Sequence, residues 1–333
     1  MKRLAFALVL AAAGPAWASY ADRPEVQAFI EEMQRRHQLD ASALTELFSR
    51  TSALPSVLRA IAPPADPRQR SWAAYRTRFI EPKRLAAGVR FMREHRAALA
   101  KAEAMSGVPA EIIAAIIGIE TFYGKHLGRY ETFAALATLA FDYPPRAELF
   151  RRELEALLLL ARDEGKPPTA YRGSYAGAIG LPQFLPSSIR AYATDFDRDG
   201  RVDLVASIED AIGSVANFLK EHGWQAGGPL AFKVGAGGTA PAELLAAGIM
   251  PHARPSEMRA LGLAVPPEAP EAPAALIDLA TPEADTEYWL GYQNFYVITR
   301  YNRSSFYAMA VCQFAEALQA ALKAAPAPRR PGD

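Results

Sequence analysis

A stretch of hydrophobic residues in the first half of the chain, positions 110–124, reads AEIIAAIIGIETFYG. As a helix it is apolar on nearly every face, which predicts burial on all sides rather than a place on the surface. Pro109 suits the first turn, Glu111 favours the positive N-terminal end of a helix, and Gly124 marks the expected end. We therefore expect the rest of the chain to be organised around this segment.

One carboxylate, Glu120, lies near the far end of this apolar run. A carboxyl group that is taken out of water resists ionisation, so burial raises its pKa. A raised pKa is what a general acid needs near neutral pH. The alternative interpretation is that Glu120 faces a wet edge where the helix ends. This segment alone does not decide between the two.

Helical periodicity recurs over residues 20–104, 131–141, 146–162 and 208–222. Residues 225–290 are rich in Gly, Pro and Ala and contain short β-like pieces, which predicts a small irregular lobe. The predicted fold class is therefore mainly α, of the α+β type. The expected divisions are a signal peptide (1–18), a helical lobe (19–104), a core with an acidic loop (105–224), a partly β lobe (225–290), the C-terminal part of the core (291–324) and a disordered tail (325–333).

The N-terminus reads MKRLAFALVLAAAGPAWAS. A basic start, a short apolar run and a small-residue site predict a secretory signal that is cleaved after Ala18. An uncleaved membrane anchor is the alternative, but the run is short for a membrane span. No cysteine follows the run for lipid attachment, and no later segment looks able to cross a bilayer. We expect an exported, soluble mature protein, periplasmic if the source is a two-membraned bacterium.

Composition removes several classes of function. The formal net charge of +1 gives no indication of a nucleic-acid partner. The single cysteine, Cys312, excludes an internal disulfide framework. The histidines form no zinc pattern, and the chain has neither a GxSxG motif nor a glycine-rich phosphate loop.

Residues 195–203 read DFDRDGRVD, which matches the start of a calcium-binding loop. The carboxylates of Asp195, Asp197 and Asp199 alternate and can converge on one hard cation, and Gly200 permits the sharp turn. The alternative is an acidic surface turn without a metal. We expect a bound Ca²⁺ with a structural role.

The end of this loop departs from the standard pattern. Position twelve is Ala206, where the standard loop has a bidentate glutamate. A later acid, Glu209 or Asp210, would have to close the site. Asp210 has a second role open to it, since Ser207 and Asp210 are spaced as a capping box for the next helix.

Residues 171–194 mix glycines and prolines with aromatic and small polar residues. Such loops let the backbone approach a ligand closely, although an ordinary connecting segment is the alternative. Aromatic and small polar side chains suit sugar rings. A glycoside-cleaving site usually needs two carboxylates, and only Glu120 stands out here. One acid is enough if the substrate supplies the second function.

Five segments together resemble the membrane-bound lytic transglycosylase B family. They are IETFYG (119–124), SYAGAIGLPQFLPSS (174–188), DFDRDG (195–200), EDAIGSVANFLKEHGW (209–224) and ITRYNRSSFYAMAV (298–311). The resemblance extends to about residue 320. It implies a lysozyme-like core with a helical lobe and a small β-containing lobe, and non-hydrolytic cleavage of peptidoglycan between N-acetylmuramic acid and N-acetylglucosamine. Intramolecular attack by the C6 hydroxyl would leave a 1,6-anhydro end.

The resemblance also implies site residues. The family's catalytic glutamate matches Glu120, and no cofactor serves catalysis. The positions implied to contact the sugar or surround the acid are Ser174, Gln183, Tyr75, Tyr301, Asn302 and Tyr307. The implied calcium ligands are Asp195, Asp197, Asp199, the carbonyl group of Arg201 and a later acid, Asp210. The implied partner is the peptidoglycan strand. Protein partners in cell-wall synthesis or remodelling stay open.

Two rival functions share part of this pattern. A hydrolytic muramidase would use Glu120 with a second carboxylate, for which Asp142 and Glu131 are the candidates. A non-catalytic peptidoglycan-binding protein would use Glu120 only structurally. One departure from the family concerns localisation, because its name implies a lipid anchor and this chain has no cysteine after its signal.

Overall fold

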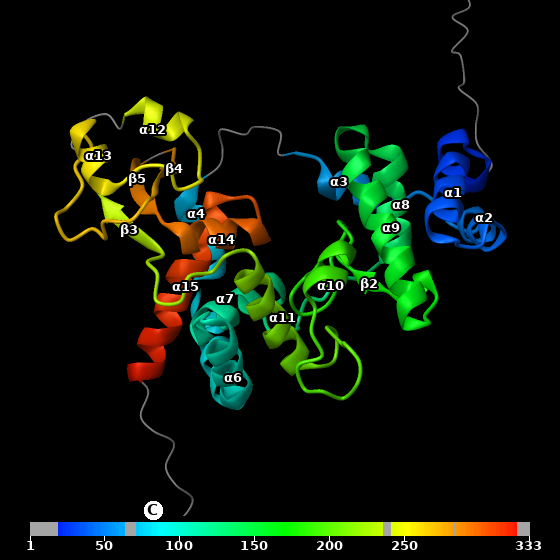
Figure 1. Cartoon of the computed structure of the whole chain (residues 1–333), viewed down its shortest axis with the longest axis horizontal. Coiled ribbons are helices and arrows are strands. Elements are labelled where there is room, and N and C mark those ends of the chain that lie inside the picture. Colours follow the sequence, from blue (N-terminus) through cyan, green and yellow to red (C-terminus); the bar gives the residue numbers. More distant parts are fainter. Residues whose placement is uncertain (1–18, 64–70, 236–240, 283, 325–333) are drawn as a thin grey trace, which may run out of the picture.

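The computed structural model describes residues 19–63, 71–235, 241–282 and 284–324 (Figure 1). The predicted signal peptide (1–18) and the predicted tail (325–333) lie outside the described residues. Helices dominate the described part, and two small antiparallel sheets accompany them. The mainly α, α+β fold class is therefore confirmed.

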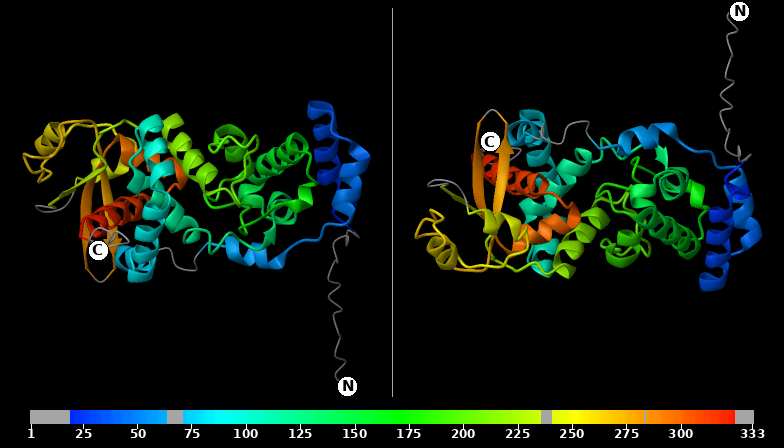
Figure 2. Two further views of the ribbon diagram at one scale, coloured as in Figure 1. Left: turned by 90° about the horizontal axis from the view of Figure 1, so that it is seen from below. Right: turned by 90° about the horizontal axis from the view of Figure 1, so that it is seen from above.

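The elements fall into three groups along the long axis of the molecule (Figures 1 and 2). At one end lie η1 (Tyr20–Asp22), α1 (Pro24–His37), α2 (Ala41–Ser49), α3 (Pro55–Ile61), α8 (Thr132–Asp142), η3 (Pro144–Arg146), α9 (Ala147–Glu164) and η4 (Pro168–Ala170). A second group extends from the middle of the molecule to the region below the small lobe in Figure 1. It contains α4 (Trp72–Phe79), α5 (Pro82–Glu94), α6 (Arg96–Ser106), α7 (Ala110–Thr121), β1 (Tyr130–Glu131), β2 (Arg172–Gly173), α10 (Pro186–Tyr192), α11 (Ile208–Glu221), α14 (Gln293–Tyr301) and α15 (Ser305–Ala324). At the other end lie β3 (Ala231–Val234), α12 (Ala242–Ala246), α13 (Pro255–Ala260), β4 (Ala275–Thr281) and β5 (Ala284–Gly291).

The predicted central helix is α7. Residues 112–119 are buried on every face, and α5, α6, α11 and α15 all contact the helix. Pro109 is its N-cap. The helix ends at Thr121 rather than at Gly124, because Phe122 and Tyr123 take left-handed backbone conformations with φ of 52° and 58°. Sequence periodicity does not reveal such a turn at two non-glycine residues.

The helices of the predicted lobe 19–104 pack against two different sets of helices. Next to α8 and α9, α1 and α2 bury an aromatic cluster in which Phe48 lies 5.1 Å from Phe133 and 5.9 Å from Phe141, centroid to centroid. Helices α4, α5 and α6 instead contact α7, α11 and α15. The helical prediction holds within the described residues, but these helices do not share one separate core.

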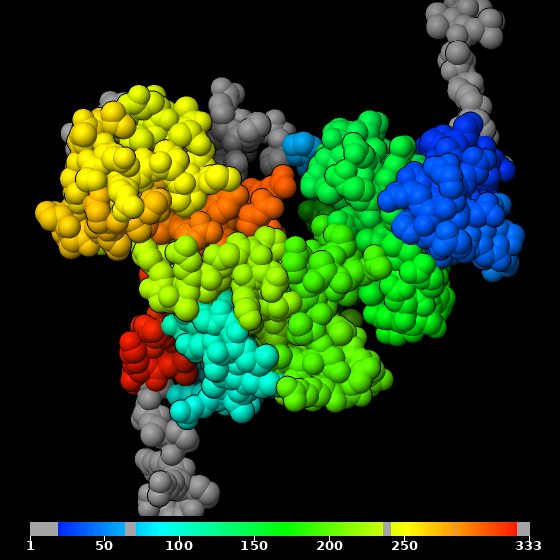
Figure 3. Space-filling model, in the orientation of Figure 1, coloured from blue at the N-terminus to red at the C-terminus, as the bar shows by residue number. Residues whose placement is uncertain are grey.

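The small lobe contains a three-stranded antiparallel sheet in the order β3-β5-β4. Leu290 on β5 pairs with Phe232 on β3 and with Leu276 on β4. One face covers a core of its own, which includes Val234, Leu244, Met258, Leu276, Leu290 and Tyr292. Figure 3 shows this lobe in yellow, at the opposite end from the blue α1 and α2.

Within the described residues, no single helix has the length and apolar character needed to cross a bilayer. Taken together, α6 and α7 are long and apolar enough to cross a bilayer, but the two helices meet at a bend of 114°.

Candidate active site

Glu120 lies in the last turn of α7 and keeps part of its surface exposed, whereas residues 112–119 before it are buried. Burial around the carboxyl group raises the pKa of Glu120 from 4.5 to about 7. A hydrogen bond from Tyr307 acts against this rise, because it stabilises the carboxylate. A group with this pKa can both give and take a proton near neutral pH.

Two tyrosines from the C-terminal helices surround the acid. The hydroxyl group of Tyr307, on α15, donates to Oε1 of Glu120 at 2.7 Å. Tyr301, at the end of α14, stacks on Tyr307 with ring centroids 6.4 Å apart and an interplanar angle of 13°. Burial, followed by the charge of Glu120, holds the pKa of both hydroxyl groups well above 10. Both therefore act as donors rather than bases.

The chain beyond Glu120 is tied to the loop that carries the predicted sugar contacts. Thr121 is fully buried, and its Oγ1 lies 3.0 Å from the carbonyl oxygen of Leu181. The hydroxyl group of Tyr301 donates to the carbonyl oxygen of Pro182, one residue further on. Helices α7 and α14 thus both contact the same short stretch of loop, at Leu181 and Pro182.

Gln183 follows in that loop with a left-handed backbone, φ 51°. Its Nε2 donates to the carbonyl oxygens of Gly180 at 2.9 Å and Leu127 at 3.3 Å. Both donations fix the amide plane. Its Oε1 receives no hydrogen bond from the described residues, so this atom can accept one from a ligand.

Ser174 shapes the start of the same loop. Its Oγ accepts hydrogen bonds from the backbone N–H groups of Ala176 at 3.3 Å and Ala178 at 3.1 Å. The side chain therefore stabilises a turn, and its hydroxyl proton is left for donation outward. The structural role of Ser174 thus leaves its predicted binding role open as a prediction.

Tyr75 and Asn302 are the two remaining predicted residues near the tyrosine pair. Tyr75, on α4, packs against Phe79 in a tilted arrangement and against Phe306 edge-on, at centroid distances of 5.0 Å and 5.7 Å. Its hydroxyl group is close enough to Tyr307 to contribute to the raised pKa of that residue. Asn302 directly follows Tyr301 and is exposed, with an extended backbone. Four of the predicted residues, namely Glu120, Tyr75, Tyr301 and Tyr307, are thus linked through their contacts. Gln183 directly follows Pro182, which Tyr301 contacts, and Ser174 and Asn302 lie on the adjoining segments.

Sequence reasoning missed two supporting residues, Thr121 and Phe184. Phe184 is buried under Tyr301 at a centroid distance of 5.7 Å, and Phe218 joins it from α11 at 4.9 Å. Phe218 is thus a core residue that packs against the ring of Tyr301. One signal could have pointed to Thr121, since it is a polar residue that continues an apolar helix directly after the acid.

The two candidates for a second carboxylate differ in their surroundings. The carboxylate of Asp142 accepts hydrogen bonds from Tyr20 and from Arg23, the latter at 2.6 Å, and so belongs to the contact between α8 and the N-terminal helices. Glu131 lies on β1, paired with Arg172 of β2 through the backbone. The raised pKa of Glu120 owes nothing to a neighbouring acid among the described residues.

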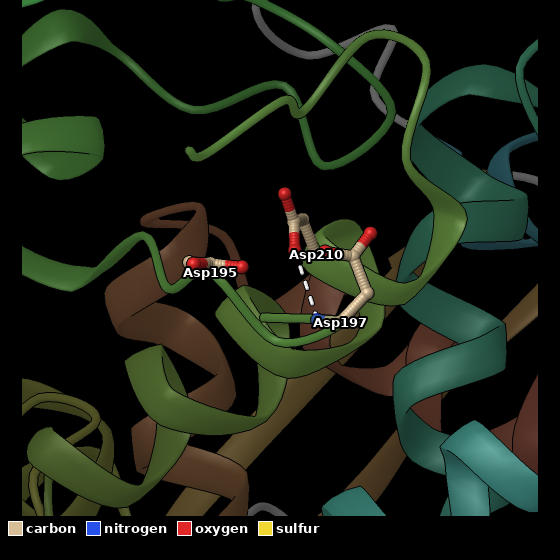
Figure 4. A group of neighbouring side chains, drawn as sticks. All are labelled: Asp195, Asp197 and Asp210. Carbon is tan, nitrogen blue, oxygen red and sulfur yellow. Dashed lines mark hydrogen bonds between the residues drawn. The ribbon is translucent and has the colours of Figure 1, made fainter. Parts of the chain in front are cut away.

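The acidic loop brings three carboxylates together. One oxygen from each of Asp195, Asp197 and Asp210 lies within 4.8 Å of the others (Figure 4). Calcium binds oxygen at about 2.3–2.6 Å, so opposite ligands stand about 5 Å apart and this spacing fits a shared ion. Asp210 is buried, and its carboxylate also accepts N–H groups from Phe196 at 2.7 Å and Asp203 at 2.8 Å.

Asp210, and not Glu209, thus belongs to the three-acid group, which makes Asp210 the candidate for the closing acid. The capping-box prediction is half met, since the hydroxyl group of Ser207 accepts the N–H of Asp210 at 3.1 Å while the Asp210 carboxylate turns into the loop. Asp199 lies outside the three-acid group, and its carboxylate binds the backbone and guanidinium of Arg201 at 3.0 Å and 3.2 Å. Metal ligation by Asp199 and Arg201 stays a prediction.

Comparison with known proteins identifies the family of the chain. The family described as Transglycosylase SLT domain matches residues 21–316, most of the chain. The chain belongs to this family. Its similarity to the membrane-bound lytic murein transglycosylase B of Escherichia coli K12 amounts to 42% identity over 313 residues, which is 90% of this chain and 84% of the relative.

Two solved structures show the same fold. Soluble lytic transglycosylase SltB1 from Pseudomonas aeruginosa is 44% identical with a TM-score of 0.81, over 90% of this chain and all (100%) of that one. The E. coli lytic transglycosylase Slt35 in complex with calcium is 41% identical with a TM-score of 0.80, over 91% of this chain and 95% of that one. The protein is thus a lytic transglycosylase, an enzyme that cleaves peptidoglycan.

We predict that Tyr307→Phe raises the pKa of Glu120 above its value of about 7, because the lost hydrogen bond stabilises the charged form. The carboxyl resonance of Glu120, followed by NMR across a pH titration, measures the shift. Tyr301→Phe is the matched control, since the Tyr301 hydroxyl donates to Pro182 and not to Glu120. An unchanged or lower pKa in Tyr307→Phe would contradict the assigned hydrogen bond.

Proposed function

We propose that Glu120 is the only catalytic acid and base of a lytic cleavage of peptidoglycan. The observation that carries the proposal is the contact between Glu120 and Tyr307 at the buried end of α7: the carboxyl group is taken out of water, its pKa is raised to about 7, and no charge of another described acid contributes to that rise. A retaining or inverting glycosidase keeps two carboxylates about 5–9.5 Å apart across the bond. With one, the substrate itself has to supply the second group.

The reaction then proceeds in two halves. Protonated Glu120 gives its proton to the oxygen that links N-acetylmuramic acid to N-acetylglucosamine, and the bond from C1 to that oxygen breaks. The N-acetyl group of the muramoyl unit stabilises the cationic centre at C1. Glu120, now charged, takes the proton of the C6 hydroxyl, whose oxygen attacks C1. The product is a 1,6-anhydro ring, and Glu120 is again protonated.

Effective molarity explains why the C6 hydroxyl competes successfully with water. An internal nucleophile that is already oriented behaves as if present at about 10⁵–10⁸ M, far above the concentration of water. Water needs a second carboxylate to activate it, and Asp142 is occupied by Arg23 and Tyr20. A hydrolytic muramidase is therefore the less favoured function, and a raised pKa at Glu120 speaks against a binding protein without catalysis.

The remaining predicted residues act around this acid. We propose that Tyr307 orients the carboxyl group and favours its charged form after proton transfer, when Glu120 acts as base. Gln183 and Ser174 offer one acceptor and one donor to the muramoyl unit. Tyr75, Tyr301 and Asn302 complete the walls of the site.

We further propose that the acidic loop holds a structural Ca²⁺ through Asp195, Asp197 and Asp210, with Asp199 and the carbonyl group of Arg201 as further ligands. The spacing of the three carboxylates and the calcium complex of the relative Slt35 support this. A structural role follows from the position of the loop, which is held by α11 through Asp210 and by α6 through Lys101, whose Nζ donates to the carbonyl oxygen of Phe196 at 2.6 Å.

The place of action follows from the substrate and from the N-terminal pattern. We propose that residues 1–18 direct export and that the enzyme works in the periplasm on glycan strands. The name of the E. coli relative describes that protein as membrane-bound.

Glu120→Gln tests the catalytic assignment. We expect the variant to lose cleavage of purified peptidoglycan by at least about 10³-fold while it still binds glycan strands. Because the folded-state pKa of Glu120 is raised, the charged form opposes folding above pH 7, so the neutral variant should be more stable than the wild type at pH 8, by up to about 3 kcal/mol, and equally stable near pH 4. Turnover assays and thermal melts at the two pH values measure both effects.

Glu111→Gln is the matched control for this experiment. Glu111 lies at the other end of the same helix, where its Oε1 accepts a hydrogen bond from Nε2 of Gln319 at 3.0 Å. The control should retain cleavage and show no gain in stability at pH 8. Retained turnover in Glu120→Gln would overturn the assignment.

Removal of calcium tests the metal proposal. With Ca²⁺ at about a hundred times its dissociation constant, binding stabilises the fold by about 2.7 kcal/mol, so a chelator should lower the melting temperature by several degrees. Asp197→Asn should reduce this shift, whereas Asp278→Asn, the same charge change on the exposed face of β4, should not. The proposal would be contradicted if the melting temperatures of the wild type, Asp197→Asn and Asp278→Asn all stayed the same with Ca²⁺ and with chelator.

A further inference from the structure

Thr121, the residue next to Glu120, uses its side chain entirely within the protein. It is fully buried, and its Oγ1 accepts the N–H of Gly124 at 3.1 Å. Its single hydroxyl proton is shared between the carbonyl oxygens of Leu181 at 3.0 Å and Ile117 at 3.2 Å. One side chain thus joins the catalytic helix, the turn that follows it and the sugar-binding loop.

The turn that Thr121 closes is strained. Phe122 and Tyr123 both take left-handed conformations, which cost free energy for residues with a Cβ atom. The bond from Gly124 to Thr121 spans these two residues and therefore holds the strained segment in place. Without it, α7 could continue by another turn, which would change the direction of its last residues, Glu120 among them.

The loop on the other side of Thr121 is fixed as well. The N–H of Leu181 donates to the carbonyl oxygen of Leu204 at 2.8 Å, in the segment that follows the acidic loop. Gly180 lets these chains approach, since a Cβ atom there would lie 2.4 Å from the Leu204 oxygen. The peptide groups at Leu181 are thus bound on one side by residue 204 and on the other by Thr121.

We infer that Thr121 is a positioning residue that sets the distance between the Glu120 carboxyl group and the loop carrying Gln183. Glu120 and Thr121 are consecutive, and Leu181 and Gln183 are two residues apart, so the hydrogen bond from Thr121 to Leu181 is a short link between acid and sugar contacts. The role rests on the proposed function of Glu120 as the acid. Nothing in the reaction touches Thr121 itself.

The test compares Thr121→Val with Thr121→Ser. Valine has the shape of threonine but can neither donate to Leu181 nor accept from Gly124, whereas serine keeps both bonds. A displacement of about 1 Å in a reacting group costs about a hundredfold in rate. We expect kcat of Thr121→Val to fall between about tenfold and a hundredfold with a smaller change in KM, and Thr121→Ser to restore most of it.

The pH profile separates positioning from mere loss of stability. If the helix end loosens, water reaches Glu120 and its pKa falls from about 7 towards its usual range, so the alkaline limb of kcat/KM should move to lower pH in Thr121→Val. Thr138→Val is the matched control. Thr138 is also fully buried, donates to Ala134 four residues earlier at 2.8 Å and accepts the N–H of Leu54 at 3.0 Å. That variant should melt earlier but keep kcat and the pH profile.

The outcomes distinguish the proposed catalytic function of Glu120 from the positioning role of Thr121. Turnover by Glu120→Gln would overturn the proposed function, whatever Thr121 does. An inactive Glu120→Gln together with a Thr121→Val enzyme whose kcat and alkaline limb equal those of the wild type would overturn the positioning role alone. If Thr121→Val fails to fold, the Thr121→Ser profile decides, because a hydroxyl that is one methyl group smaller should keep the alkaline limb in place, and a shifted limb would contradict the inference.

Discussion

The structure depends on the burial of α7. A helix that is enclosed on every face leaves its ends as the only places where a polar group can meet a ligand, and Glu120 occupies the last turn. The same enclosure that stabilises the core through apolar burial also takes the carboxyl group out of water and raises its pKa to about 7. The fold thus raises the pKa of this carboxyl group at a cost in stability, a pattern common at catalytic sites.

The surroundings of Glu120 come from segments that are far apart along the chain. Tyr307 reaches it from α15, Tyr301 supports Tyr307 from α14, and the carbonyl group of Pro182 joins Tyr301 to the loop that carries Gln183. These contacts give the acid a donor that favours its charged form while burial favours its neutral form. A group balanced in this way can serve as acid in the first half of a reaction and as base in the second.

The sequence predicted the parts of this arrangement that depend on local pattern. The buried helix, the lone carboxylate and the acidic loop all follow from residue types at fixed spacing. The end of α7 was placed three residues too late, because the left-handed turn at Phe122 and Tyr123 leaves no trace in hydrophobic periodicity. The helices of residues 19–104 were expected to form one lobe, but periodicity states which face is apolar and not which partner covers it.

Long-range contacts were accessible only through the resemblance to a family. Nothing in the composition around Tyr307 points to Glu120, which lies 187 positions earlier. The choice between Glu209 and Asp210 likewise needed the structure, since both follow Ser207 within one helical turn and only Asp210 turns into the loop. Thr121 was overlooked because a threonine at the end of an apolar helix is usually a packing residue.

In the reaction proposed for this enzyme, one carboxylate and an internal hydroxyl group cleave the glycan without water. Mass spectrometry of the sugar products after digestion of purified peptidoglycan in water enriched in ¹⁸O tests this reaction. We expect muropeptides that end in 1,6-anhydro-muramic acid, one water lighter than hydrolysed ends and free of ¹⁸O. Reducing ends that carry ¹⁸O would contradict it and would require a second group that activates water.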